Sequence, residues 1–250
     1  MLPSRRHPAL RAAAAGRCGA RGLRTAAAQS AVELAVFDLD GTITRRDTLA
    51  PYVFGFLRRV PWRALGLLAF VPALLLFALG WRDHGQLKSA FIRHTLGGCL
   101  RTEIESWSRE FVERLLAGRA AGGVFRDALE QIARHRAAGA RLILLSASTD
   151  LYVPEIGRAL GFAAVICTGV RWDGERLDGH LTTANRRGGE KVRCFLELRQ
   201  QYPEFAAAAY GNTATDLPHL RLAERPLLVN GSAQARRQAA LLGVPCASWH

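Results

Sequence analysis

The stretch AVFDLDGTIT, residues 35–44, places two aspartates directly behind an apolar run. The apolar residues before Asp38 have the length and side-chain type of a short buried strand, and a glycine-containing turn follows. Because side chains alternate along an extended chain, Asp38 and Asp40 can both project toward the same edge while Leu39 packs behind them. Two close carboxylates repel each other unless a cation lies beside them. The stretch therefore predicts a cation site at a strand end, and Mg²⁺ suits its oxygen ligands.

Helical and extended patterns alternate along the rest of the chain. An amphipathic helix over residues 124–139 is followed at once by a strand over 140–148. The alternation predicts an α/β fold with a Rossmann-like, doubly wound parallel sheet covered on both faces. The later elements are expected at 151–160 (helix), 163–169 (strand), 170–182 (hairpin turning at Asp173-Gly174), from Gly189 (helix), 205–212 (strand), 217–222 (helix), 226–231 (strand) and 232–242 (helix).

Polar residues stand at the ends of four predicted strands. They are Asp38, Ser146, Asn212 and Asn230. Ligands of parallel α/β sheets bind at the carboxyl ends of the strands, so we expect these four side chains to converge at one edge of the sheet.

Composition and length allow a sizeable core. The chain has 250 residues, of which 49% are hydrophobic, enough for one large domain or for a core with an insertion. The five cysteines show no CxxC spacing, which indicates neither a zinc site nor a disulfide framework and fits a reducing compartment.

The formal net charge of +13 is concentrated in part at the start of the chain. The first 30 residues hold six arginines and no acid, and they lack the apolar core of a secretory signal. We expect a disordered extension over residues 1–30; a transit peptide has the same composition and is the alternative. The remaining +7 is typical of a solvated surface and also suits an anionic membrane surface or a phosphate substrate, whereas no motif indicates a nucleic-acid partner.

Four motifs in order resemble those of the haloacid dehalogenase-like phosphohydrolases. FDLDGT resembles the first motif, DxDGT, and LLSAS contains Ser146 at the place of the second motif's Ser or Thr. GGEKVR supplies Lys191 for the third motif, and YGNTATDLPHL resembles the fourth motif, GDSxxDxxxL, with Asp216. The resemblance covers about residues 33–243 and implies an enzyme, a phosphoric monoester hydrolase that uses Mg²⁺.

The resemblance also implies a role for each matching residue. Asp38 would attack phosphorus and form an aspartyl-phosphate. Asp40 would protonate the leaving oxygen and then take a proton from the hydrolytic water, while its backbone carbonyl binds Mg²⁺. We expect Thr42 to orient the carboxylates by hydrogen bonding. The residues expected at the substrate phosphate are Gly41, Thr42, Ser146 and Lys191.

The fourth motif departs from the family pattern at one position. Asn212 stands where the family usually has an aspartate that binds the metal. An amide oxygen can still bind Mg²⁺, but one negative charge is lost, so weaker binding is expected. Either Asn212 or Asp216 can be the direct ligand, and a pseudoenzyme that binds a phosphate without turnover is an alternative. The predicted metal ligands are Asp38, Asp40, Asn212 and Asp216.

An insertion separates the first two motifs, and substrate choice is expected to lie there. Residues 47–119 are predicted to form an apolar helical cap, inserted after the first strand between core segments 31–46 and 120–250, as in the phosphoserine-phosphatase-like branch (subfamily IB). Asp47 occupies the position, nine beyond the nucleophile, where phosphoserine phosphatases have a glutamate that contacts the substrate amine. Asp47 is therefore a candidate substrate contact.

The cap includes ALGLLAFVPALLLFALGW, residues 64–81, eighteen residues without a charge. This apolar cap, with the RRD that follows the first motif, resembles the phosphatidylglycerophosphatase C-like proteins of bacteria. The length is borderline for a membrane span, but a single crossing would separate Asp38 from Ser146. The segment is therefore predicted to pack inside the cap, to re-enter with a break at Pro72, or to lie at the membrane interface.

These features predict a Mg²⁺-dependent phosphomonoester hydrolase that acts through an aspartyl-phosphate. A lipid phosphate such as phosphatidylglycerophosphate is the expected substrate, at the cytoplasmic face of the inner membrane, with the protein peripheral or re-entrant. The alternative is a soluble cytoplasmic phosphatase for a small metabolite, similar to phosphoserine phosphatase.

Overall fold

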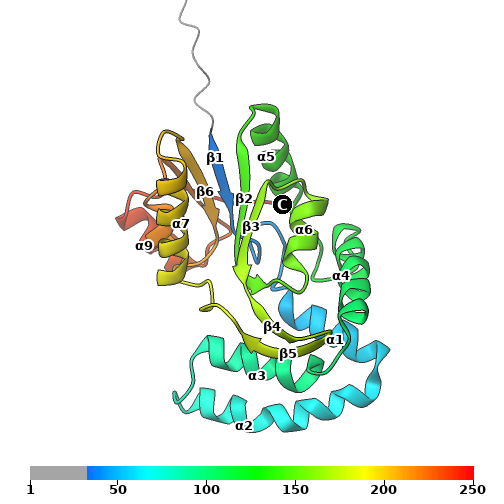
Figure 1. Cartoon of the computed structure of the whole chain (residues 1–250). Helices are drawn as coiled ribbons and strands as arrows, with labels where there is room; N and C mark the ends of the chain where they lie inside the picture. The colour runs from blue at the N-terminus through cyan, green and yellow to red at the C-terminus, as the bar shows by residue number, and fades with distance from the viewer. Residues whose placement is uncertain (1–32) are drawn as a thin grey trace, which may run out of the picture. The chain divides into compact units, whose positions relative to one another are not determined.

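The computed structural model describes residues 33–250, so the extension expected over residues 1–30 lies outside the described residues. A six-stranded parallel sheet forms the centre of the fold, in the order β3-β2-β1-β6-β7-β8 (Figure 1). The predicted α/β fold is thereby confirmed. The strands are β1 Leu34–Phe37, β2 Arg141–Thr149, β3 Ala164–Thr168, β6 Ala207–Gly211, β7 Arg225–Val229 and β8 Cys246–Ala247.

Alternation along β1 explains why helices cover both faces of the sheet. Ala35 and Phe37 pack on one side with residues of α5 and α6, whereas Leu34 and Val36 pack on the other with residues of α7, α8 and α9. All four side chains are at most 1% exposed, so β1 is a central strand. The helices are α5 Arg126–Ala137, α6 Val153–Ala159, α7 Gly189–Gln201, α8 Leu217–Leu220 and α9 Ala233–Leu241.

A helical insertion follows β1, as predicted. It contains α1 Leu49–Arg59, a 3₁₀ helix Pro61–Leu65 (η1), α2 Gly66–Ala78, α3 His84–Leu96 and α4 Arg101–Leu116. We call this insertion the cap. All described residues belong to one compact unit, so the expected division at residues 47 and 119 stays a prediction.

The predicted hairpin is present and lies against the cap rather than within the main sheet. Its strands are β4 Val170–Asp173 and β5 Arg176–Leu181, and the hairpin lies beside α3 (Figure 1). Asp173 pairs with Arg176, so the turn residues are Gly174 and Glu175, one position later than expected. Gly174 has φ +55°, which glycine adopts at little cost.

Aromatic residues fix the cap to the core near the ends of the strands. Tyr52 of α1 stacks on Tyr152, which precedes α6, with ring centroids 4.5 Å apart. Trp107 of α4 donates from Nε1 to the Tyr52 carbonyl at 3.1 Å, and Ser108 Oγ donates to the Leu151 carbonyl at 2.6 Å. Burial of these large side chains stabilises one arrangement of α1 and α4 above the sheet.

Helix α2 packs differently from the rest of the cap. Ala73 is its one buried residue, although the helix is almost wholly apolar. The segment Pro61–Ala78 is long and apolar enough to cross a membrane, with mean hydropathy 1.7, yet 6% of it is buried. The expectation that this segment packs inside the cap is therefore wrong, because most of its side chains are exposed.

Candidate active site

A cavity of about 380 Å³ lies where β1 and β6 end. Most of the predicted site residues line it, although they come from three separate parts of the sequence. The carboxyl ends of neighbouring parallel strands meet at one edge of the sheet, which is why these residues come together. Those in the wall are Asp38, Asp40, Gly41, Asp47, Lys191, Asn212 and Asp216.

A buried lysine joins two of these carboxylates. Lys191 Nζ lies 2.7 Å from Asp38 Oδ1 and 2.7 Å from Asp216 Oδ1, and all three residues are at most 6% exposed. Burial raises the pKa of Asp38 to about 7, although Lys191 opposes the rise. Burial alone would also raise the pKa of Asp216, but the Lys191 ammonium outweighs it and holds that pKa far below its usual range.

The lysine itself stays charged in this setting. Burial acts to lower the pKa of Lys191, but Asp38 and Asp216 together raise it above its usual value. The cavity therefore has a permanent cation at its base, directly beside the predicted nucleophile.

Three hydrogen bonds hold the Asp40 carboxylate. Its Oδ1 accepts from the Thr48 backbone N at 2.8 Å and from Thr48 Oγ1 at 2.7 Å, and its Oδ2 accepts from Ser148 Oγ at 2.6 Å. Thr48 is the residue before α1 and Ser148 lies in β2, so a cap residue and a core residue position the same side chain. Burial, with the nearby charge of Asp47, raises the pKa of Asp40. A raised pKa favours a carboxyl group that must carry a proton.

Two predicted phosphate ligands lie behind the cavity wall. Thr42 Oγ1 donates to Asp38 Oδ2 at 3.3 Å, the orienting hydrogen bond that we expected. Ser146 does not end β2, which continues to Thr149 with a register shift against β3. Ser146 is fully buried, its Oγ accepts from the Ser148 N at 3.0 Å, and Ala147 lines the cavity instead. Contact of Ser146 with a phosphate stays a prediction.

Asn230 does not join the site. Its Oδ1 accepts from the Trp249 N at 2.8 Å, and the residue is outside the cavity wall. The expected convergence of four strand-end residues is thus wrong for this one, which instead holds the C-terminal segment against the end of β7.

Asn212 has the free acceptor that a cation needs. Its Oδ1 is buried and has no hydrogen-bond partner among the described residues. Asp216 Oδ2, by contrast, accepts from the Thr213 N at 2.9 Å and from Thr213 Oγ1 at 2.7 Å, while its other oxygen binds Lys191. Gly41 lets the amide approach, because a Cβ there would lie 2.0 Å from Asn212 Nδ2. This arrangement favours Asn212 as the direct metal ligand.

The donor set fits Mg²⁺. The Asp38 carboxylate, the Asp40 backbone carbonyl and the Asn212 amide are all oxygen donors, which this ion prefers. Within residues 33–250 no group of three or more His, Cys, Asp and Glu side chains could hold a metal. That finding is compatible with this set, because two of its three donors are of other kinds.

Sequence reasoning missed the cations at the cavity mouth. Arg45, Arg46 and Arg187 line the cavity together with the residues already described. Each of these arginines lies close to a motif. Arg45 and Arg46 follow the first motif, and Arg187 lies in RRGGEK, which contains Lys191 of the third motif. An arginine pair next to a phosphate-binding motif is the signal that could have identified them.

A second missed residue is Lys88 on α3. Its Nζ donates to the Ala147 carbonyl at 2.5 Å and to Asn185 Oδ1 at 2.7 Å. Burial lowers the pKa of Lys88 to about 8. The side chain thus connects the cap to the strand that carries Ser146.

Comparisons with known proteins agree with this geometry. The family model described as haloacid dehalogenase-like hydrolase matches residues 35–221. Protein CicA of Caulobacter vibrioides is 34% identical over 200 residues, which cover 76% of this chain and 83% of CicA. The probable phosphatase Rv3661 of Mycobacterium tuberculosis is 27% identical over 217 residues, covering 86% of this chain and 75% of the relative.

Solved structures share the fold. A probable phosphoserine phosphatase from Vibrio cholerae superposes with a TM-score of 0.64 at 15% identity, covering 88% of this chain and 62% of that one. At this level of identity the likeness shows a common fold, which is a parallel sheet with a helical insertion after the first strand.

Proposed function

Because the chain belongs to the haloacid dehalogenase-like hydrolase family and is a phosphatase of that family, we propose that it hydrolyses a lipid phosphomonoester such as phosphatidylglycerophosphate at a membrane surface. The buried Asp38–Lys191 pair at the end of β1 supports the chemistry. The single observation that carries the lipid assignment is the exposed apolar face of the cap.

In the proposed reaction, Asp38 attacks phosphorus and the bond from phosphorus to the alcohol oxygen breaks. Asp40 gives its proton to that oxygen, and the alcohol leaves. Water then attacks the phosphorus of the aspartyl-phosphate and Asp40 takes a proton from the water. The bond from phosphorus to the Asp38 oxygen breaks, which restores the carboxylate and releases inorganic phosphate. Lys191 lies where it can compensate the charge on the phosphoryl oxygens throughout.

Asp38, the Asp40 carbonyl and Asn212 would hold Mg²⁺ in this reaction. When bound, the ion supplies positive charge that offsets the negative charge of the phosphoryl oxygens. Thr42 restrains the Asp38 carboxylate through its hydrogen bond.

Replacing Asn212 with aspartate should tighten Mg²⁺ binding, because the site gains an anionic oxygen at the place of a neutral one. We expect the half-saturating Mg²⁺ concentration for phosphate release to fall by about tenfold, the effect of roughly 1.4 kcal/mol. Asn230→Asp is the matched control, since it adds the same charge at the end of β7, outside the cavity. An unchanged Mg²⁺ requirement in Asn212→Asp would assign the metal to Asp216 instead.

The apolar cap face consists of the outward side chains of η1, α2 and the turn after it. Leu68 is 70% exposed and Trp81 is 75% exposed. Leu65, Leu68, Leu75 and Leu79 follow a spacing of three, seven and four residues, so they share one side of the helix. Large exposed apolar patches are rare on soluble monomers and are typical of membrane or partner contacts. The face comprises Trp62, Leu65, Leu68, Val71, Leu74, Leu75, Leu79 and Trp81.

Topology supports a surface position for this face rather than a crossing. The cap begins after β1 and ends before α5, and the two strands β1 and β2 are neighbours in one sheet (Figure 1). Both ends of the cap therefore lie on the same side of any bilayer, and a single span is excluded. An apolar helix that lies in the interface satisfies this condition.

Charge near the apolar face is smaller than the sequence suggests. Arg59 forms an ion pair with Glu110, and Arg63 donates to the Gly97 carbonyl at 2.8 Å. Arg58 is exposed and forms no ion pair with another described residue. We therefore assign most of the proposed membrane affinity to apolar contact and a smaller share to headgroup attraction.

Vesicle binding tests the membrane part of the proposal. The protein should cosediment with anionic vesicles. Replacing Leu68, Leu75 and Leu79 with serine should weaken binding by at least about tenfold, because each replacement removes apolar surface that the bilayer would cover. Hydrolysis of phosphatidylglycerophosphate should fall in parallel, whereas hydrolysis of p-nitrophenyl phosphate should persist.

The matched control exchanges exposed leucines of the core. Leu196→Ser, Leu222→Ser and Leu241→Ser remove similar side chains from α7, the segment after α8 and α9. That variant should bind vesicles like the parent. A parent protein that stays in the supernatant and prefers phosphoserine would overturn the lipid proposal.

That outcome would favour the second candidate, a soluble phosphatase for a small metabolite. Asp47 supports this second candidate. It is exposed and lines the catalytic cavity, where its carboxylate could contact a substrate amine. Its Oδ1 also accepts a hydrogen bond from the Leu49 N at 3.0 Å, so Asp47 already has a structural role at the start of α1 that needs no substrate.

A further inference from the structure

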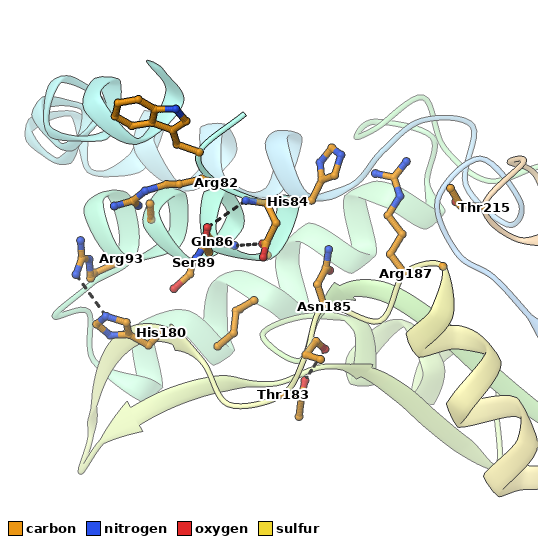
Figure 2. Close-up of a pocket in the computed structure, with 17 residues that line it drawn as sticks. Arg82, His84, Gln86, Ser89, Arg93, His180, Thr183, Asn185, Arg187 and Thr215 are labelled. Atoms are coloured by element: carbon orange, nitrogen blue, oxygen red, sulfur yellow. Dashed lines mark hydrogen bonds between the residues drawn. The ribbon is translucent and has the colours of Figure 1, made fainter. Parts of the chain in front are cut away.

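A second, larger cavity adjoins the catalytic one. Its volume is about 880 Å³, and it lies between the start of α3, strand β5 and the segment that connects β5 to α7 (Figure 2). Arg187 and Thr215 line both cavities, so the two meet at these residues. A substrate whose phosphomonoester sits at Asp38 would therefore extend its alcohol portion into the second cavity.

Positive charge dominates the wall of this cavity. Three arginines line it: Arg82, Arg93 and Arg187. In the view of Figure 2, Arg187 lies on the side of Thr215, and Arg82 and Arg93 lie on the opposite side. Cations are thus found both at the junction with the catalytic cavity and at the far end.

No ion pair within the described part of the chain neutralises these arginines. None of the three forms an ion pair within residues 33–250, although many other arginines there do. The one carboxylate in the wall, Asp83, accepts from the Gln86 N at 2.8 Å and caps α3. Arg93 has only imidazole nitrogens of His94 and His180 beside it, at 3.4 Å and 3.3 Å.

Size and charge together identify the class of group that fits. A serine-sized alcohol would occupy a small part of 880 Å³, a volume within the range of pockets for ligands of several hundred daltons. Guanidinium groups match phosphate oxygens in charge and in hydrogen-bond geometry. Trp81 lines the cavity and also belongs to the apolar cap face, so the far end of the cavity opens toward that face.

We propose that the second cavity binds the leaving group of the substrate and that this leaving group carries a second phosphate, held by Arg82 and Arg93. This inference rests on the proposed function, because it requires the monoester to be hydrolysed at Asp38. A phospholipid headgroup and a water-soluble phosphodiester share this chemistry, and the experiment below distinguishes them.

Soluble substrates test the second phosphate without a membrane. Glycerophosphoglycerol phosphate carries a monoester and a phosphodiester, whereas glycerol 3-phosphate carries the monoester alone. We expect kcat/KM to be at least about tenfold higher for the first compound, the gain of one charge-assisted contact. Arg82→Gln should remove most of that preference and leave glycerol 3-phosphate hydrolysis unchanged.

Arg109→Gln is the matched control. Arg109 is an exposed residue of α4 that forms no ion pair with the described residues and does not line the cavity. Its loss should leave the preference intact. The inference is wrong if the parent hydrolyses both compounds equally well, or if Arg82→Gln lowers both reactions to the same extent.

A binding measurement keeps this inference separate from the proposed function. Calorimetry with the Asp38→Asn variant and glycerophosphoglycerol, a phosphodiester without a monoester, measures the second cavity when no turnover occurs. Binding that Arg82→Gln weakens about tenfold supports the inference even if no monoester is hydrolysed, and absence of binding overturns it. Failure of the parent to hydrolyse glycerol 3-phosphate and p-nitrophenyl phosphate would instead overturn the proposed function.

A comparison of a lipid substrate with a soluble one identifies the source of the second phosphate. Phosphatidylglycerophosphate in mixed micelles is compared with glycerophosphoglycerol phosphate at equal concentration. A higher kcat/KM for the lipid supports a phospholipid headgroup in the cavity. Equal values also support the second phosphate and assign it to a soluble phosphodiester.

Discussion

Replacing Asp38 with asparagine should abolish turnover and leave the fold intact. An amide cannot attack phosphorus to form an acyl phosphate, and removal of a nucleophile lowers kcat by on the order of 10⁴-fold or more. The fold should persist because asparagine has nearly the same volume and Lys191 keeps its contact with Asp216 at 2.7 Å. Release of p-nitrophenol measures turnover, and thermal unfolding measures the fold.

Asp150→Asn provides the comparison. Asp150 follows β2, outside the catalytic cavity, and its Oδ1 accepts from the Val170 N at 3.0 Å, a bond that asparagine can also accept. That variant should keep activity within a few-fold of the parent. Parent-like turnover by Asp38→Asn would show that another group attacks phosphorus.

Replacing Lys191 with methionine should both inactivate and destabilise the protein. The ammonium lies between Asp38 and Asp216, and removing one partner of a buried ion pair costs about 3–5 kcal/mol because charge stays buried without compensation. Burial already raises the pKa of Asp38 to about 7 against the opposing effect of Lys191. Without the lysine that pKa should rise further, so the nucleophile would be protonated at neutral pH.

Urea unfolding in Mg²⁺-free buffer measures the loss of stability. The double variant Lys191→Met, Asp216→Asn removes one of the two uncompensated carboxylates, so it should regain part of the unfolding free energy but no activity. Lys88→Met is the control, because Lys88 is the chain's only other lysine and it contacts a carbonyl and an amide oxygen rather than a carboxylate. Equal stability of Lys191→Met and the parent would contradict the account.

The sequence predicts the core and most of the residues that line the candidate active site. Apolar runs of strand length alternate with amphipathic helices, and polar residues follow the runs at Asp38 and Asn212. Such local patterns determine which strands are central and where their ends lie. Strand β8 was not predicted, because it has two residues, Cys246 and Ala247, and a pattern of that length cannot be distinguished from a loop.

The hydrogen bonds within the site do not follow from local patterns. Asp40 accepts from Ser148, which is 108 residues away, and from Thr48, which the cap positions. Ser146 turned out to be enclosed because β2 extends past it to Thr149. In each case the partner is set by how α1 and β2 pack together, which no single stretch of sequence encodes.

The exposure of α2 is likewise a result of tertiary packing. Residues 64–81 are apolar on every side, so their pattern contains no periodicity that separates a buried helix from an exposed one. The structure places α3 between α2 and the hairpin, which leaves the outer side of α2 without a protein neighbour among the described residues (Figure 1). That arrangement motivates the membrane proposal.

Chemical trapping of the aspartyl-phosphate tests the central claim most directly. The parent protein is mixed with p-nitrophenyl phosphate and Mg²⁺, quenched in acid during turnover, and treated with borohydride, which reduces an acyl phosphate to an alcohol. We predict that mass spectrometry of the peptide between Arg24 and Arg45 finds homoserine at position 38 and unchanged aspartate at position 40. Homoserine at position 40, or unmodified aspartates at both positions while phosphate is being released, would contradict the assignment of Asp38 as the nucleophile.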